Sequence, residues 1–158
     1  MSDQMRYENS AGASVAICIC TFRRPQGLKN VLDSLQNLIF DHGRLSVFVA
    51  DNDFASHAGY DFIEKEKGAY RFDIFCEIEE KPGISHARNR TLRMVKNASG
   101  VFNYIAFTDD DVEVSRHWLQ DLVATAMLYK ADIVVGKREA KFAVPPSWDI
   151  LQSGFFDD

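Results

Sequence analysis

Three consecutive aspartates, Asp109, Asp110 and Asp111, are the residues whose types and spacing are best suited to chemistry. They directly follow the apolar run YIAFT at residues 104–108, which is typical of a buried strand. Neighbouring carboxylates repel one another at neutral pH, and a divalent cation that prefers oxygen ligands relieves that repulsion. In such a turn Asp109 and Asp111 can face one side while Asp110 points away. The pattern favours a Mg²⁺ or Mn²⁺ site, and a solvated acidic turn or a helix N-cap cluster is the structural alternative.

A basic segment supplies the complementary chemistry. The turn KPGI at residues 81–84 opens a predicted helix whose first turns carry Arg88 and Arg90. Free backbone N–H groups and the positive end of the helix dipole meet guanidinium groups there, and arginine grips phosphate oxygens with two parallel hydrogen bonds. The segment therefore indicates an anion site. The alternative is a helix with a solvated basic face, which is what we expect of Arg93 and Lys96.

Polar residues also follow two other apolar runs. The run at residues 14–21 ends in Thr21 and leads into Arg23, and the run at residues 44–50 leads into Asp51. In an open α/β sheet, ligands bind beyond the carboxyl ends of the strands, so these residues should meet the aspartates at one edge. There Asp51 could accept a hydrogen bond from a nucleobase imide or a ribose hydroxyl. Ordinary turn chemistry is the alternative explanation for this aspartate.

Apolar runs and helical patterns alternate along the chain, which predicts an α/β fold with a mostly parallel central sheet flanked by helices. We expect one domain at residues 14–136, preceded by a polar tail at residues 1–13. An edge strand and loop are expected at residues 137–158. Strands are expected at residues 14–21, 44–50, 72–79, 104–108 and 131–135, and helices at residues 27–40, 60–67, 84–97 and 118–130.

Length and composition exclude several classes of protein. The 158 residues, 46% of them hydrophobic, suffice for one globular core, and the net charge of −5 argues against general nucleic-acid binding. The nine glycines form no G-x-G pair, so the dinucleotide fingerprint and the phosphate loop are both missing. Three cysteines form no even set, which predicts reduced thiols. The sequence shows no signal peptide or long apolar segment, so we expect a cytoplasmic protein, with peripheral docking on a membrane left open.

Four sequence segments follow one another along the chain: VAICICTFRR at residues 15–24, VFVADN at 47–52, PGISHARN at 82–89 and FTDDDV at 107–112. Together they resemble the nucleotide-binding half of a family-2-type glycosyltransferase with the Rossmann-like GT-A fold. The resemblance extends over about residues 14–136 and implies a mostly parallel sheet flanked by helices. Four motifs in the right order are much more specific than any one of them.

The resemblance implies a role for each candidate residue. The nucleoside would be held by Thr21, Arg23 and Asp51, with the Asp51 carboxylate on the base. Asp109 and Asp111 match the family's D-x-D motif, in which the first aspartate tends to touch the ribose and sometimes the metal, and the second binds Mn²⁺ or Mg²⁺. The nucleotide contacts implied are Thr21, Arg23, Asp51, Arg88 on the diphosphate, Asp109 and Asp110, and the metal ligands are Asp109 and Asp111.

The implied function is metal-dependent, inverting transfer of a sugar from a nucleoside diphosphate sugar to a saccharide, lipid or protein acceptor. Family members run past 200 residues and carry the catalytic base after the D-x-D strand, so we expect the base beyond Asp158. Asp157 and Asp158 themselves are weak candidates. One alternative is a nucleotide-sugar-binding module without turnover. The other is a nucleotidyltransferase, which typically has a glycine-rich loop after the first strand. A homo-oligomer is left open.

Overall fold

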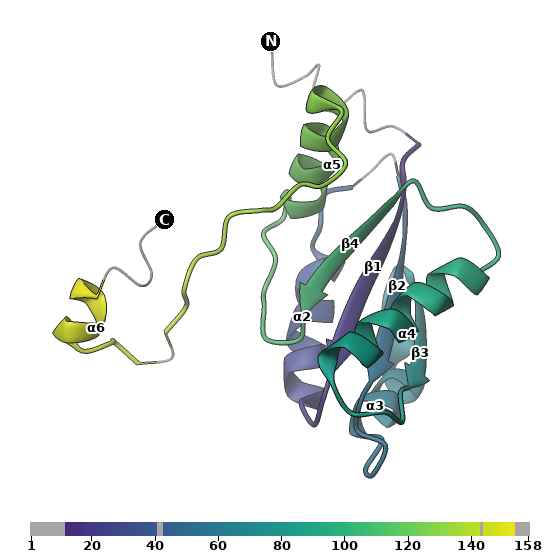
Figure 1. Cartoon of the computed structure of the whole chain (residues 1–158), viewed down its shortest axis with the longest axis horizontal. Helices are drawn as coiled ribbons and strands as arrows, with labels where there is room; N and C mark the ends of the chain where they lie inside the picture. The colour runs from purple at the N-terminus through teal and green to yellow at the C-terminus, as the bar shows by residue number, and fades with distance from the viewer. Residues whose placement is uncertain (1–11, 41–42, 143, 154–158) are drawn as a thin grey trace.

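The structure is a computed structural model that describes residues 12–40, 43–142 and 144–153. Its centre is a four-stranded sheet in the order β3-β2-β1-β4, and each neighbouring pair is parallel. The predicted parallel α/β fold is therefore confirmed. The arrowheads in Figure 1 point to one edge of the sheet, where the carboxyl ends of the strands meet. The strands are β1 (Ser14–Thr21), β2 (Arg44–Asp51), β3 (Asp73–Ile78) and β4 (Tyr104–Asp109).

Helices cover both faces of the sheet, so the central strands are apolar on both sides. In β1, Ile17 packs into a core with helices α2, α3 and α5, and its neighbour Cys18 packs into a second core under helix α4. Alternate residues of a strand point to opposite faces, which is why this strand has no polar face. Figure 1 shows α4 in front of the sheet and α2 and α3 behind it. The helices are α2 (Pro25–Gln36), α3 (Ala58–Glu66), α4 (Ile84–Asn97), α5 (Trp118–Tyr129) and α6 (Trp148–Gln152), with a 3₁₀ turn η1 at Lys67–Ala69.

Two of the helices that start at the carboxyl edge, α2 and α4, have identifiable start signals. Pro25 occupies the first turn of α2, where its missing N–H costs no hydrogen bond. Helix α4 begins after Gly83, whose φ of 121° is a conformation that side chains rarely allow. Both helix starts therefore lie next to the ends of the strands, as the turn residues predict.

The last third of the chain departs from the sequence-based prediction. Residues 131–135 form no strand, and Ile133 and Val135 are 83% and 82% exposed. A strand needs a ladder partner, and β4 pairs in the described structure only with β1. The edge strand expected at residues 137–158 is likewise absent from its described part. There the chain runs as an extended arm to the short helix α6 (Figure 1).

Three other predictions concern the cysteines, membrane-spanning segments and the two ends of the chain. The three cysteines are free, as predicted. None of the helices in the described part of the chain has the length and apolar character needed to cross a bilayer. The candidate bases Asp157 and Asp158, and all but the last two residues of the polar tail at residues 1–13, lie outside the described residues.

Candidate functional site

The acidic loop at the end of β4 separates its three carboxylates into one buried and two exposed groups. The Thr21 hydroxyl donates to Asp110 Oδ2 at 2.7 Å, and both residues are buried. Asp109 and Asp111 lie at the surface, with 44% and 62% of their side chains exposed. The burial of Asp110 agrees with the expectation that it points away from its two neighbours, and the expectation that Asp109 and Asp111 face one side stays a prediction. The Thr21 and Asp110 side chains bind each other and anchor the loop, and their contact with a nucleotide stays a prediction.

Arg23 and Arg24 extend to two different acidic groups. Arg23 adopts a left-handed backbone with φ of 56°, and its Nε lies 3.1 Å from Asp53 Oδ2. Arg24 Nη1 lies 2.9 Å from Asp111 Oδ2 and 3.5 Å from Asp110 Oδ1. The hydrogen bond to Asp111, together with the charges of both aspartates, raises the pKa of Arg24. Sequence reasoning selected Arg23 for the site and missed Arg24, although both stand in the same TFRR motif.

Asp51 binds backbone N–H groups at the end of β2, and its predicted contact with a nucleobase stays a prediction. Its Oδ1 accepts the backbone N–H of Asp53 at 2.9 Å, and its Oδ2 accepts those of Gly59 and Tyr60, also at 2.9 Å. The residue is fully buried, so its charge serves the start of α3. A Cβ on Gly59 would lie 2.7 Å from Thr21 Cγ2, so only glycine permits this approach. The buried Asp51 side chain therefore holds the backbone segments next to the candidate site in place.

Asp53, which sequence reasoning left out of the site, supports the surface that Arg23 occupies. The Ser56 hydroxyl and Arg23 Nε both donate to Asp53 Oδ2, and the backbone N–H of Ala55 donates to Oδ1 at 3.3 Å. The hydrogen bond from Ser56, with smaller contributions from Arg23 and Ala55, lowers the pKa of the Asp53 carboxyl group. A permanent negative charge thus holds Arg23 beside the end of β2.

A single amide side chain ties the end of β2 to the loop before α4. Asn52 Nδ2 donates to the backbone oxygens of Glu79 and Lys81 at 2.9 and 2.8 Å. Its Oδ1 accepts the backbone N–H of Gly83 at 2.8 Å. These three bonds use both donors of the amide and fix the turn from which α4 begins. Asn52 was another residue that sequence reasoning missed as a contributor to the site.

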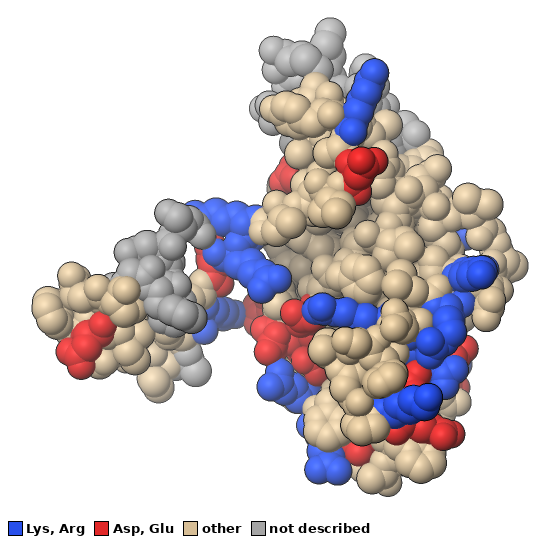
Figure 2. All heavy atoms as spheres, in the orientation of Figure 1, with Lys and Arg blue, Asp and Glu red and all other residues tan. Residues whose placement is uncertain are grey.

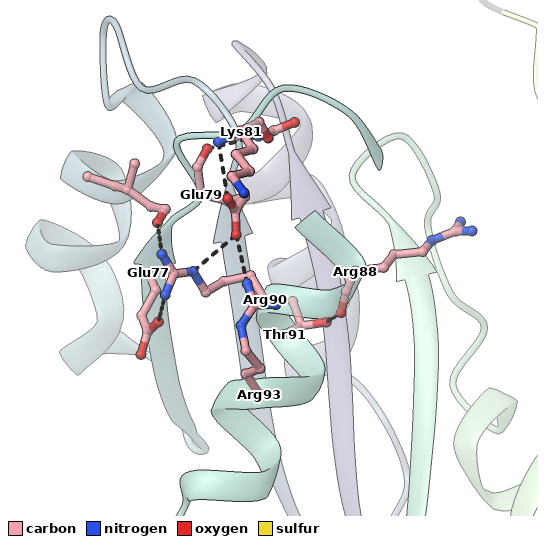
Figure 3. A network of polar contacts seen from close by, with 9 residues as sticks. Glu77, Glu79, Lys81, Arg88, Arg90, Thr91 and Arg93 are labelled. Carbon is pink, nitrogen blue, oxygen red and sulfur yellow. Dashed lines mark hydrogen bonds and ion pairs between the residues drawn. The ribbon is translucent and has the colours of Figure 1, made fainter. Parts of the chain in front are cut away.

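Glu79 occupies the centre of a network that holds two arginines of α4 against β3 (Figure 3). Its side chain is 7% exposed and accepts Arg93 Nη2 at 2.8 Å and the Lys81 backbone N–H at 3.1 Å, and Arg90 Nε lies 3.4 Å away. The bond from Lys81 and the charges of Arg90 and Arg93 lower the pKa of Glu79. Arg90 also lies 3.2 Å from Glu77. Arg93 and Lys96 are exposed, in agreement with the predicted solvated basic face, and Arg93 also pairs with Glu79.

Arg88 is the arginine of α4 that extends toward the acidic loop. Figure 3 shows its side chain directed away from the Glu79 network. Its Nη2 lies 3.6 Å from Asp109 Oδ1, and the side chain is 49% exposed. Arg88 therefore lies next to the aspartate triplet, as predicted, and its binding of an anion stays a prediction. Acidic side chains gather near the carboxyl end of β4 in Figure 2, with Lys and Arg side chains around them.

The acidic loop and the start of α2 enclose a hollow of about 610 Å³, lined among others by Arg23, Arg24, Asp110 and Asp111. In the described part of the chain, no group of three His, Cys, Asp or Glu side chains is arranged so that it could hold a metal ion by itself. Mg²⁺-type ions commonly bind through one or two carboxylates and complete their coordination with water and substrate phosphates. The exposed oxygens of Asp109 and Asp111 fit that donor set, and Asp111 already attracts a guanidinium cation.

Gly27→Ala should disturb the acidic loop from the side of α2. A Cβ at this position would lie 2.5 Å from the backbone oxygen of Asp110, and neither backbone can yield cheaply. We expect a loss of about 1–3 kcal/mol in the free energy of unfolding, measured by urea denaturation. Gly68→Ala is the matched control, because nothing lies within 4 Å of its added Cβ. Equal stability of the two variants would contradict the close packing of α2 against the loop.

Glu79→Gln should change how stability depends on pH. Because the folded-state pKa of Glu79 is lowered, its stabilising effect is present above the pKa of the unfolded chain and is lost as the pH falls through the folded value. The stability difference between wild type and Glu79→Gln should be greatest near neutral pH and shrink below about pH 5. Urea denaturation between pH 7 and pH 3 measures it. A difference that is constant or grows in acid would refute this role.

Comparisons with known proteins agree with the geometry. A family model described as "Glycosyl transferase family 2" matches residues 16–154. The Succinoglycan biosynthesis protein ExoM of Rhizobium meliloti (strain 1021) is 36% identical over 144 residues, which cover 90% of this chain and 44% of the relative.

Two solved structures show the same fold at low identity. TarS 1-349 of S. aureus in complex with UDP-GlcNAc matches with a TM-score of 0.64 and 17% identity, over 85% of this chain and 37% of its own. The mannosyltransferase PcManGT of Pyrobaculum calidifontis, in complex with GDP-Man and Mn2+, matches with a TM-score of 0.59 and 18% identity, over 78% and 39%. The chain thus spans less than half the length of each of these relatives.

Proposed function

This chain belongs to glycosyl transferase family 2, and from that premise we propose that it binds a nucleoside diphosphate sugar at the carboxyl edge of its sheet for transfer of the sugar to an acceptor. The observation that carries the proposal is the proximity of Arg88 to Asp109, at 3.6 Å, beside the exposed carboxylate of Asp111. The ligands named for the two solved relatives, UDP-GlcNAc and GDP-Man with Mn2+, support it.

We place the diphosphate between the acidic loop and the start of α4. Asp109 and Asp111 would hold a divalent cation, and Arg88 would bind a phosphate oxygen from the other side. When bound, a divalent cation neutralises negative charge on the departing diphosphate. Arg88 adds a fixed positive charge at the same place, so it stabilises the charge that grows as the bond from the sugar to the diphosphate breaks.

The nucleoside would lie toward the end of β2, in contact with Arg23. Asp53 orients the Arg23 side chain, of which 61% is exposed and available to a ligand. Thr21, Asp51 and Asp110 contribute indirectly, because their buried hydrogen bonds fix the ends of three strands. We propose inverting transfer, in which the acceptor hydroxyl attacks the sugar opposite the diphosphate and gives its proton to a general base.

Titration calorimetry with UDP and GDP, each with and without Mn²⁺, tests the proposal. We expect binding of at least one of the two diphosphates, and at least tenfold weaker binding when Mn²⁺ is replaced by EDTA. A folded sample that binds neither diphosphate in the presence of Mn²⁺ would rule the proposal out. Incubation with the matching nucleoside diphosphate sugar then separates transfer from mere binding, because only an active enzyme releases the sugar.

A further inference from the structure

Arg24 combines an anchored backbone with an exposed side chain that pairs with a carboxylate. Its carbonyl accepts the N–H of Leu28 at 2.9 Å, and Pro25 follows it, so its Cα is anchored at the start of α2. Its guanidinium group nevertheless reaches Asp111 at 2.9 Å while 57% of the side chain is exposed. The proposed function gives this arginine no task.

The ion pair between Arg24 and Asp111 is easily exchanged. Both side chains are more than half exposed, and pairs of this kind typically change an equilibrium constant by less than about fivefold. The second contact, to the buried Asp110, is longer at 3.5 Å and shares the same Nη1 atom. Arg24 thus neutralises a carboxylate that the proposed function assigns to a divalent cation, without being locked there.

Arg24 and Arg88 also approach the acidic loop from opposite faces of the sheet. Arg24 directly precedes α2, which packs on one core, and Arg88 belongs to α4, which covers the other. A diphosphate has oxygens on two phosphorus atoms, and a planar guanidinium binds such oxygens through two parallel hydrogen bonds. Two arginines on opposite sides of one acidic loop are therefore placed to bind the two phosphates separately.

We propose that Arg24 is an exchangeable counter-cation of this site, which neutralises Asp111 in the empty protein and moves to the donor diphosphate once Asp111 ligates a divalent cation. The inference rests on the proposed function and adds a phosphate-binding residue to it. It also predicts opposite effects of one substitution: removal of the Arg24 charge favours the cation and disfavours the diphosphate.

The test measures both affinities for Arg24→Gln, Arg24→Lys and the control Lys29→Gln. Lys29 lies on the same helix and pairs with Asp33, so its substitution removes one positive charge without touching the acidic loop. Electron paramagnetic resonance of free Mn²⁺ measures cation binding without nucleotide. Calorimetry at saturating Mn²⁺ measures binding of UDP or GDP, whichever the wild type binds more tightly.

For Arg24→Gln we expect about fivefold tighter binding of Mn²⁺ alone and about tenfold weaker binding of the diphosphate. Arg24→Lys should recover part of both effects, and Lys29→Gln should match wild type. The inference is overturned if Arg24→Gln leaves the affinity for Mn²⁺ or for the diphosphate unchanged, or if Lys29→Gln shifts both affinities equally. Wild type that binds neither UDP nor GDP with Mn²⁺ would instead refute the proposed function, and the inference with it.

Discussion

Asp111→Asn is expected to abolish metal-dependent binding of the nucleoside diphosphate and to leave the fold intact. The side chain is 62% exposed and, within the described part of the chain, forms its ion pair with Arg24, so the free energy of unfolding should change by less than about 1 kcal/mol. Loss of a metal-ligand carboxylate should exceed the 10- to 100-fold effects of residues that merely support ligands, so we expect a loss above about 100-fold. Calorimetry with Mn²⁺ and UDP or GDP measures it.

Two controls make this result specific. Asp121→Asn removes the same charge from an exposed position in the first turn of α5, and it should leave diphosphate binding unchanged. Asp110→Asn, in the same acidic loop, should instead lower stability, because its buried carboxylate accepts the Thr21 hydroxyl. If Asp111→Asn unfolds the protein, or if it binds the diphosphate as wild type does, the assignment of Asp111 as a metal ligand is wrong.

Asp51→Asn should have the largest effect on stability. Both carboxylate oxygens of Asp51 accept hydrogen bonds from backbone N–H groups. The –NH₂ group of an asparagine cannot accept such a bond, so it would place a donor against a donor. The site is fully buried, and an unsatisfied group there together with the lost charge should cost about 3 kcal/mol. That is a large part of the roughly 5–15 kcal/mol that typically stabilises a domain.

Urea denaturation measures this effect, with Asp61→Asn as the matched control. Asp61 lies in the first turn of the same helix, α3, but is exposed, so its substitution should cost less than about 1 kcal/mol. Near-normal stability of Asp51→Asn combined with lost nucleotide binding would restore the direct contact with the base that the sequence suggested.

Most of the sheet could be predicted because its strands have short, unambiguous apolar runs. Strand β1 is buried on both faces, which occurs where helices cover both sides of a parallel sheet. Residues 131–135 have an equally apolar pattern and form no strand. The local sequence determines the tendency of a segment to be extended. Strand formation also requires a neighbouring strand with a free edge, which depends on the tertiary structure.

The sequence predicted which candidate residues lie together, but not the hydrogen-bond partners of each side chain. Asp109, Asp111 and Arg88 meet at one edge because strand ends and a helix start do so in this topology. The role of Asp51 depends on amides of Gly59 and Tyr60, whose approach no local pattern reveals.

The contacts of the two adjacent arginines depend on the backbone conformation between the strand and the helix. Arg23 adopts a positive φ, and its side chain reaches Asp53 at the end of β2. Arg24, one residue later, reaches the acidic loop after β4. A positive φ at a non-glycine residue is rare, so no local sequence pattern predicts that the two arginines reach different carboxylates.

The central claim is that Asp111 and Arg88 border one site for a divalent cation and a diphosphate. Nuclear magnetic resonance of the ¹⁵N-labelled chain with UDP or GDP and substoichiometric Mn²⁺ tests it directly, because the paramagnetic ion broadens the signals of nearby amides. We predict the strongest broadening in the acidic loop after β4 and at the starts of α2 and α4. Broadening centred on the opposite edge of the sheet, or none with diphosphate bound, would contradict the claim.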